Sequence, residues 1–165
     1  MIMKNYTTEI KFSLILTLLT ITWTSAEKLL GFHDEHIALH PFISMLILIP
    51  LIYIYYCCLT EKKHKHYQNQ MSYWQGLLTS IRFSAITALL TPLSQVLISK
   101  VITPKYFQNA IAYSVKNNFM SQVDAEAHFN LNSYIVQSVM GCLLMGCLIG
   151  LVLAAVCKTR KKTAN

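Results

Sequence analysis

The sequence predicts an all-α integral membrane protein, built as a four-helix bundle of membrane spans with a periplasmic amphipathic helical hairpin between spans three and four. Apolar residues make up 54% of the 165 residues and charged residues only 13%, whereas about a quarter of a soluble domain is charged. The basic residues behind the net charge of +7 stand at the ends of four apolar runs. This placement indicates membrane topology and not a basic stripe for nucleic acid. We therefore expect one membrane domain over residues 1–165.

The first apolar run, about 12–30, is long enough as a helix to cross a hydrocarbon core of about 30 Å. Glu27 and Lys28 then lie near its far surface. The alternative is a secretory signal peptide, because lysines precede the run and residues 24–26 are small enough for a cleavage site. We favour the span, because Trp23 fits poorly beside a cleavage site and further apolar runs follow.

The second span covers about residues 42–59. Pro41 can open it, because the first turn of a helix has no partner for the N–H that proline lacks. Pro50 lies inside the span and predicts a kink. The segment 61–66, with three lysines and two histidines, is expected to be a solvated basic loop.

The third span, about 73–102, carries polar residues at depth. Arg82 lies near the aromatic edge of the span, so its side chain either reaches the headgroups or forms a buried functional charge. Pro92 frees a backbone carbonyl, and Gln95 needs a hydrogen-bonding partner in lipid. We expect that partner to lie on another helix.

The hairpin is expected over about residues 104–130. Thr103 reads as a helix cap followed by a first-turn proline, and residues 117–118 should break the helix that follows. Ser121 can cap a second short helix, whose positive end Asp124 complements. Aromatic residues would let this hairpin rest on the membrane surface or cover the bundle.

The last span, about 133–157, carries a stripe of small residues at every fourth position. Such spacing leaves a groove in which another helix backbone can approach closely. We expect packing against another helix of the same chain, and a homodimer or a partner membrane protein remains the alternative. The stripe consists of Ser138, Cys142, Gly146, Gly150 and Ala154.

Orientation follows from the lysines and arginines of the short loops. Lys4, Lys11, the segment 61–66 and the tail 158–162 fall on one side of the predicted bundle, whereas the segment 27–40 holds a single lysine and falls on the other. The sequence therefore predicts an inner-membrane protein with both termini in the cytoplasm. The segment 27–40 and the hairpin should face the periplasm.

The segment 27–40, which we call the polar segment, concentrates the groups that could bind a proton, a metal ion or a partner. If it were helical, His33, His36 and His40 would share one face, with Glu27 one or two turns earlier. Three imidazoles and a carboxylate could hold zinc or another divalent ion. Asp34 adds a second carboxylate to this candidate polar site. A loop between spans is also an ordinary place for polar residues, and no HExxH motif is present.

Several stretches resemble one known family, the four-span Bacteroidota membrane proteins of domain-of-unknown-function family 4199. The resemblance covers nearly the whole chain and implies four spans, but it implies no activity. Lys105, Ala112 and Lys116 make the hairpin less acidic than is usual in that family. The stretches are Trp23 with Glu27-Lys-Leu-Leu-Gly31-Phe-His33-Asp34, Met71-Ser-Tyr-Trp-Gln75-Gly76, Thr91-Pro92-Leu-Ser-Gln95, Ile102-Thr-Pro104-Lys-Tyr-Phe107 and Ala125-Glu126-Ala-His-Phe129-Asn-Leu131.

For function, the sequence favours a structural or accessory membrane protein that binds a partner, with no catalytic residue and no cofactor predicted. One alternative is a component of a small-solute or proton transporter, in which Glu27, Arg82 and Gln95 would be candidate polar groups. The other is a periplasm-facing metal-binding protein or metalloenzyme that uses the histidines of the polar segment.

Overall fold

The computed structural model describes residues 6–159. Lys4 and residues 160–162, on which the predicted orientation partly depends, lie outside the described residues. All regular elements of the described chain are helical, as the sequence predicts. They are α1 (Thr7–Leu29), the 3₁₀ turn η2 (Ile37–Leu39), α2 (His40–Met45), α3 (Leu48–His66), α4 (Tyr73–Leu97), the π-helical turn η3 (Ile98–Ile102), α5 (Tyr106–Lys116), α6 (Gln122–His128) and α7 (Leu131–Cys157).

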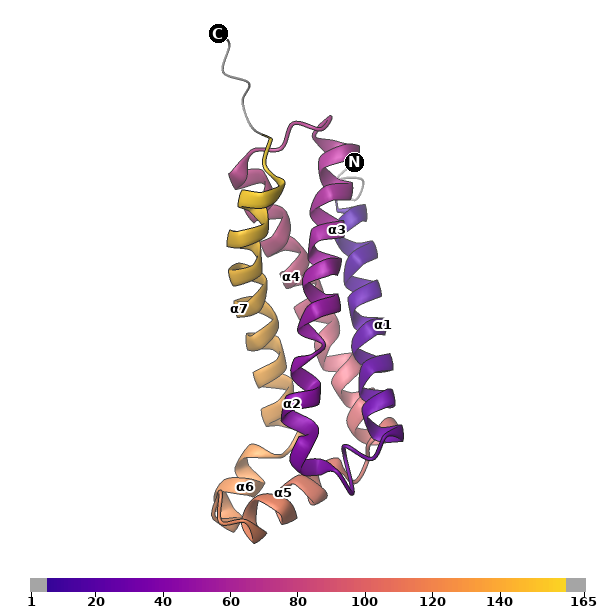
Figure 1. Cartoon of the computed structure of the whole chain (residues 1–165), viewed down its shortest axis with the longest axis vertical. Coiled ribbons are helices and arrows are strands. Elements are labelled where there is room, and N and C mark those ends of the chain that lie inside the picture. The colour runs from indigo at the N-terminus through magenta and orange to yellow at the C-terminus, as the bar shows by residue number, and fades with distance from the viewer. Residues whose placement is uncertain (1–5, 160–165) are drawn as a thin grey trace. The chain divides into compact units, whose positions relative to one another are not determined.

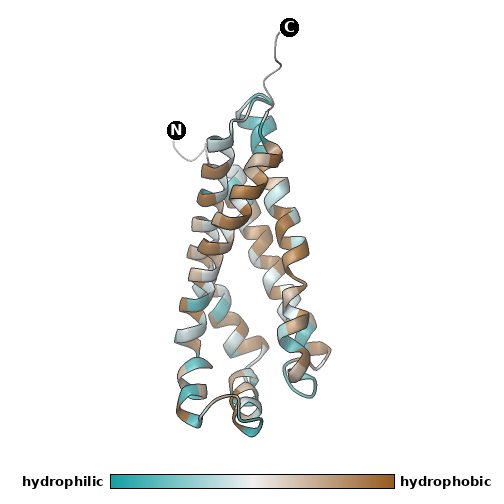
Figure 2. Ribbon diagram, turned by 60° about the vertical axis from the view of Figure 1, so that its left-hand side comes forward, coloured by the Kyte–Doolittle hydropathy of each residue, from teal (hydrophilic) through white to brown (hydrophobic). Residues whose placement is uncertain are grey.

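Within residues 6–159, three helical stretches are long and apolar enough to cross a membrane: Ile37–His66, Tyr73–Ile102 and Leu131–Cys157. Large apolar side chains lie exposed along them, such as Leu89 at 77% and Val152 at 64% exposed, and the ribbon coloured by hydropathy shows their apolar character (Figure 2). Lipid would cover such side chains. The helix α1 is not among the three, because its threonines and the charges near both ends lower its hydropathy.

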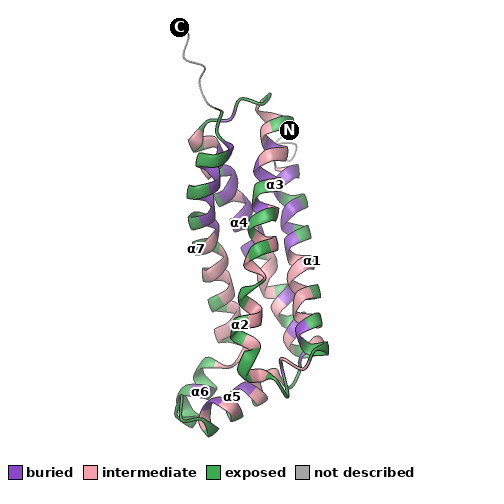
Figure 3. Ribbon diagram, in the orientation of Figure 1, coloured by how far each residue is buried: buried purple, intermediate pink, exposed green. Residues whose placement is uncertain are grey.

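The described chain forms two compact units, and α1, α4 and α7 each contribute residues to both. The first unit contains residues 6–16, 49–88 and 141–159, and the second contains residues 17–48 and 89–140. In the first unit, parts of α1, α3, α4 and α7 pack side by side (Figure 1). Many of their buried side chains are apolar, Tyr55, Leu59 and Phe83 among them. Figure 3 colours the buried stretches of these helices purple.

The small residues of α7 face α4 within the first unit. A methyl group added at Gly146 would lie 1.5 Å from the Ser84 Oγ, and one added at Gly150 would lie 2.7 Å from the Ser80 Cβ. Further along, Ala154 lies against Gly76 in the same way. Only a glycine allows α4 to come this close at these two positions of α7.

The segment 61–66 is not a loop, because α3 continues through it to His66. The solvated-loop prediction is therefore wrong, and the reason is a buried ion pair. Lys62 is only 2% exposed and donates a 2.8 Å hydrogen bond to the fully buried Glu9 carboxylate on α1. Beside it, Lys11 pairs with Glu61 at 2.6 Å on the exposed side of the same two helices. These cross-helix pairs keep the basic segment helical.

The sequence predicts the helix break before Pro50 correctly, but it does not predict how the helix after Pro104 begins. The helix is interrupted at residues 46–47, between α2 and α3, as expected because Pro50 has no N–H to donate to the carbonyl four residues earlier. By contrast, Thr103 does not cap α5. Its side chain donates to the Ile98 carbonyl, closing the π-helical turn, and Lys105 occupies the N-cap position instead.

The predicted hairpin contains α5 and α6, which pack against each other in the second unit. The helix α5 ends at Lys116, and Asn118, with a φ of 56°, lies in the turn that follows, which confirms the predicted break. Ser121 caps α6 by accepting a 3.2 Å hydrogen bond from the Asp124 N–H, as the sequence predicts.

Candidate functional site

The candidate site lies in the second unit, where the polar segment folds back onto the end of α1. The helix α1 ends at Leu29, and Gly31 follows with a φ of +78°, a backbone conformation that L side chains rarely adopt. The Gly31 N–H donates to the Lys28 carbonyl, and the Phe32 N–H donates to the Glu27 carbonyl, both at 3.0 Å. This pair of bonds is the Schellman motif. The turn reverses the chain and returns His33 to the side of Glu27.

His40 reaches the same place from the other direction. It is the first residue of α2, directly after the turn η2, and Pro41 follows it where a helix tolerates proline. Ser44 lies one turn further along α2 and therefore on the same face as His40. The site thus combines the last turn of α1 with the first turn of α2.

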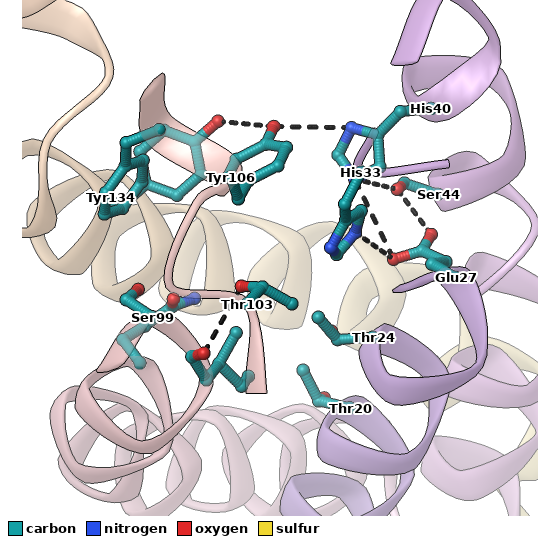
Figure 4. Close-up of a pocket in the computed structure, with 13 residues that line it drawn as sticks. Thr20, Thr24, Glu27, His33, His40, Ser44, Ser99, Thr103, Tyr106 and Tyr134 are labelled. Carbon is teal, nitrogen blue, oxygen red and sulfur yellow. Dashed lines mark hydrogen bonds and ion pairs between the residues drawn. The ribbon is translucent and has the colours of Figure 1, made fainter. Parts of the chain in front are cut away.

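Three potential metal ligands converge there: the Glu27 carboxylate and the imidazoles of His33 and His40 (Figure 4). The Nε2 atoms of His33 and His40 lie 3.5 Å and 3.8 Å from the same Glu27 oxygen, Oε2. All three ligand atoms lie within 4.8 Å of one another. Ligand atoms around a tetrahedral zinc ion are about 3.3 Å apart, since each Zn–N or Zn–O bond is about 2.0–2.2 Å long. Small side-chain movements would suffice to bind an ion.

The Glu27 carboxylate is held by its other oxygen. Trp23 Nε1 and Ser44 Oγ donate hydrogen bonds to Oε1 at 2.8 Å and 2.6 Å. Glu27 itself is only 4% exposed. Because both donors act on Oε1, the carboxylate is oriented with Oε2 towards the two imidazoles. Hydrogen bonds of this kind orient the ligands of metal sites.

His40 is oriented by two tyrosines. Its Nδ1 lies 3.3 Å from the Tyr106 hydroxyl, which lies 2.9 Å from the Tyr134 hydroxyl. Burial, reinforced by the neighbouring Tyr134 and by Glu27, raises the pKa of the Tyr106 phenol well above its ordinary value. Tyr106 therefore stays neutral, and it can accept a hydrogen bond from His40 while donating one to Tyr134.

His33 is the most deeply buried of the three imidazole-bearing groups of the polar segment, at 3% exposed. Its Nδ1 has no hydrogen-bonding partner among residues 6–159, and the contact of its Nε2 is with the Glu27 carboxylate at 3.5 Å. Its backbone is nevertheless fixed, because Asn109 Nδ2 on α5 donates to the His33 carbonyl at 3.0 Å and to Asp34 Oδ1 at 2.6 Å. A buried ring nitrogen without a partner is costly unless a ligand satisfies it.

The three groups open onto a cavity of about 140 Å³ within the second unit. Gln95 also lines it, and Gln95 Nε2 donates a 2.8 Å hydrogen bond to Ser138 Oγ on α7. The prediction that Gln95 finds its partner on another helix is confirmed. The residues that close the π-helical turn, Ile98 and Thr103, form another part of the wall. The cavity leaves room for a water molecule or a small ligand beside a bound ion.

The other candidate residues of the sequence lie outside this cluster. His36 is exposed, and its ring centroid lies 6.2 Å from that of Phe32. Asp34 is exposed and accepts the bond from Asn109 described above. Arg82 belongs to the first unit, where its guanidinium carbon lies 5.4 Å from the centre of the Tyr6 ring.

Sequence reasoning missed the residues that orient Glu27 and His40. Ser44 carries the one available signal, because a serine four residues after His40 shares its helix face. Tyr106, Tyr134 and Asn109 are far from the polar segment in sequence, and nothing in their local pattern distinguishes them from the other aromatic and amide residues of the hairpin region.

The arrangement of two imidazoles and one carboxylate can bind a divalent ion through three protein ligands. Zinc sites of this composition keep a fourth position for water or another small ligand. Without an ion, the same groups could share a proton between Glu27 and an imidazole. Both chemistries require His33 and His40 to remain buried beside the carboxylate.

Comparison with known proteins gives one similarity. The profile of a family described as "Protein of unknown function (DUF4199)" matches residues 11–159. No curated protein and no solved structure is significantly similar to the chain. The match includes every residue of the site. It also includes all the described helices, apart from residues 7–10 at the start of α1. The chain therefore belongs to the DUF4199 family of proteins of unknown function.

Proposed function

We propose that this chain is a multi-pass inner-membrane protein that binds a divalent metal ion through Glu27, His33 and His40. One observation carries the proposal: the Nε2 atoms of the buried His33 and of His40 face the same oxygen of the buried Glu27 carboxylate. A two-histidine, one-carboxylate set is suited to zinc, although imidazole also binds copper, iron and nickel.

An ion pair between Glu27 and a protonated His33 explains less of the geometry. It would leave His40 Nε2, whose other polar neighbour is Ser44 Oγ at 3.1 Å, beside a carboxylate that is already neutralised. A divalent ion accounts for both imidazoles at once. It also gives a reason for the support of His40 by Tyr106, because ligand histidines are held through their second nitrogen.

The finer topology is part of the same proposal. In it, α1 is a fourth span, which begins near Lys11 and ends near Lys28, and both termini are cytoplasmic. The lysines of α3 near residues 61–66 support this orientation through the positive-inside rule. The metal site and the pair α5–α6 then face the periplasm. Because Trp23 and Glu27 contribute to the site, the proposal keeps α1 in the mature protein.

The partner-binding role favoured by the sequence stays a prediction. A homodimer through α7 would need a different face of this helix, because α4 covers Gly146 and Gly150. A metal ion that ties the polar segment to the end of α1 is consistent with an accessory role, since it would fix the shape of the periplasmic surface.

Elemental analysis tests the proposal. The protein is purified in detergent without chelator, incubated with one equivalent of zinc, and passed through a desalting column. We expect about one zinc per chain in the natural protein and in His36→Ala, and a loss of most of it in His33→Ala, His40→Ala and Glu27→Gln. His36→Ala is the matched control, because His36 belongs to the same polar segment but lies outside the cluster.

Size-exclusion profiles must show that each variant is still folded. The proposal is wrong if the natural protein retains no metal, or if the double variant His33→Ala/His40→Ala retains as much as the natural protein. The second result would assign the metal to other groups, such as the five cysteines of the chain.

A further inference from the structure

A metal ion would satisfy only one nitrogen of His33. If Nε2 coordinates the ion, the neutral ring carries its proton on Nδ1, and ligand histidines almost always donate this second N–H to an acceptor. His40 has such an acceptor in the Tyr106 hydroxyl. Among the described residues, none accepts a hydrogen bond from His33 Nδ1. An acceptor for His33 Nδ1 would therefore come from beyond residues 6–159, for example from a bound ligand.

A second cavity, of about 250 Å³, lies against His33 in the same unit. Two lysines line it: Lys28 from the last turn of α1, and Lys105 from the residue before α5. Lys28 is exposed and donates a hydrogen bond to the Ile102 carbonyl. Asp34 is the carboxylate of the lining, and it already accepts a short hydrogen bond from Asn109. The lining therefore holds two positively charged side chains and one carboxylate that already has a hydrogen-bonding partner. This balance of charge favours an anionic ligand over water.

The start of α5 adds to the positive potential of this cavity. Residues 103–106 line it, and they lead into a helix of 11 residues. The N-cap of α5 is a lysine whose side chain makes no capping hydrogen bond, and the first turn contains no acidic residue. The positive end of the helix dipole is therefore not neutralised by the side chains that usually do so. Helix ends of this kind bind anions.

From this geometry we propose that the cavity binds a phosphate-type oxyanion, which accepts the hydrogen bond from His33 Nδ1 and pairs with Lys28 and Lys105. The inference rests on the proposed metal site, because the metal sets which nitrogen of His33 carries the proton. A tetrahedral oxyanion can accept bonds from an imidazole, two ammonium groups and a helix end at once, whereas a carboxylate has only two oxygens to share among them. Free phosphate and a phospholipid headgroup present the same chemistry.

Coupling between the two ligands is the expected consequence. A bound anion would fix the ring of His33 and its tautomer, so it would raise the affinity for zinc, and zinc would raise the affinity for the anion by the same factor. Replacement of a lysine of the cavity should remove this coupling but leave the metal ligands intact.

The test is calorimetric titration of inorganic phosphate into the full-length protein in detergent, both free of zinc and loaded with one equivalent. The variants are Lys28→Gln and Lys105→Gln, and the matched control is Lys100→Gln, because Lys100 lies in η3 and outside the lining of this cavity. A second titration uses a short-chain phosphatidylglycerol, which carries the headgroup phosphate in a soluble form.

We expect saturable binding of one phosphate-type ligand that zinc strengthens about fivefold or more. Lys105→Gln should weaken this binding about tenfold, with Lys28→Gln similar and Lys100→Gln unchanged. Tighter binding of the short-chain lipid would identify a headgroup as the source, and tighter binding of inorganic phosphate would identify the free anion.

The inference is overturned if zinc binds but neither phosphate compound does, or if Lys100→Gln weakens binding as much as Lys105→Gln. Either result would leave the metal site standing. Failure of zinc itself to bind would overturn the metal site, and this inference with it.

Discussion

His36 and His40 have the same side chain and lie four residues apart, yet only His40 takes part in the cluster. The difference comes from the backbone. Residues 30–36 form turns after the end of α1, so the helical face that would align His33, His36 and His40 does not exist. His40 instead begins a new helix, which directs its ring towards Glu27 and Tyr106. Spacing in sequence therefore selected the right segment but not the right set of residues.

At the residue scale, we predict that Tyr106→Phe weakens zinc binding about tenfold, because His40 Nδ1 loses its acceptor and loss of such support costs about 10–100-fold in metal affinity. Tyr134→Phe should have a smaller effect, since it leaves the Tyr106 oxygen in place. Competition with a chromophoric chelator gives the affinities. Tyr113→Phe is the control, because Tyr113 lies on the same helix and packs against Phe119 instead. Equal effects of all three substitutions would contradict the orienting role of Tyr106.

A second prediction concerns the buried pair of the first unit. Lys62→Met should lower the free energy of unfolding by about 3–5 kcal/mol, because it leaves the Glu9 carboxylate buried without its partner. Lys11→Met removes the neighbouring exposed pair and should cost less than about 1 kcal/mol. Unfolding in detergent mixtures with increasing dodecyl sulfate measures both values. If Lys62→Met is no more damaging than Lys11→Met, the pair does not stabilise the packing of α1 on α3.

At the element scale, the contact of α7 with α4 gives a matched pair of glycine substitutions. Gly146→Ala places a methyl group 1.5 Å from Ser84 Oγ and 2.8 Å from the Tyr55 hydroxyl, so it should destabilise the fold by about 1–3 kcal/mol. Gly141→Ala meets nothing within 4 Å and should be neutral or stabilise the helix by about 0.5–1 kcal/mol. Thermal unfolding in detergent compares the two variants, and equal midpoints would contradict the tight contact.

The elements show where sequence patterns are informative. Long apolar runs and the small-residue spacing depend on composition that is local in sequence, so the helices and the residues of the α7 groove can be read directly. The helical state of segment 61–66 could not be predicted from its own residues, because it depends on Glu9 and Lys11, which lie some 50 residues earlier along the chain. The same holds for the site: Glu27 and the histidines are local, whereas Tyr106 and Tyr134 reach them only through the fold.

At the scale of the whole molecule, the proposed topology predicts which residues are accessible from the periplasm. In a variant without the natural cysteines, Asp34→Cys should react with a membrane-impermeant maleimide in cells whose outer membrane is permeabilised. His64→Cys, at a position that is also exposed in the structure, should react only after the inner membrane is disrupted. Mass-shift labelling reads out both. The reverse pattern would place the site in the cytoplasm and overturn the proposed orientation.

The central claim is that Glu27, His33 and His40 are metal ligands, and X-ray absorption at the zinc edge of the loaded protein tests it most directly. The account predicts scattering from two imidazoles and only nitrogen or oxygen ligands at about 2.0–2.2 Å. It also predicts that the zinc still bound by His40→Ala has one imidazole fewer, and that His36→Ala gives the natural spectrum. A sulfur shell at about 2.3 Å, or a spectrum unchanged in both His33→Ala and His40→Ala, would contradict the assignment and place the metal elsewhere in the chain.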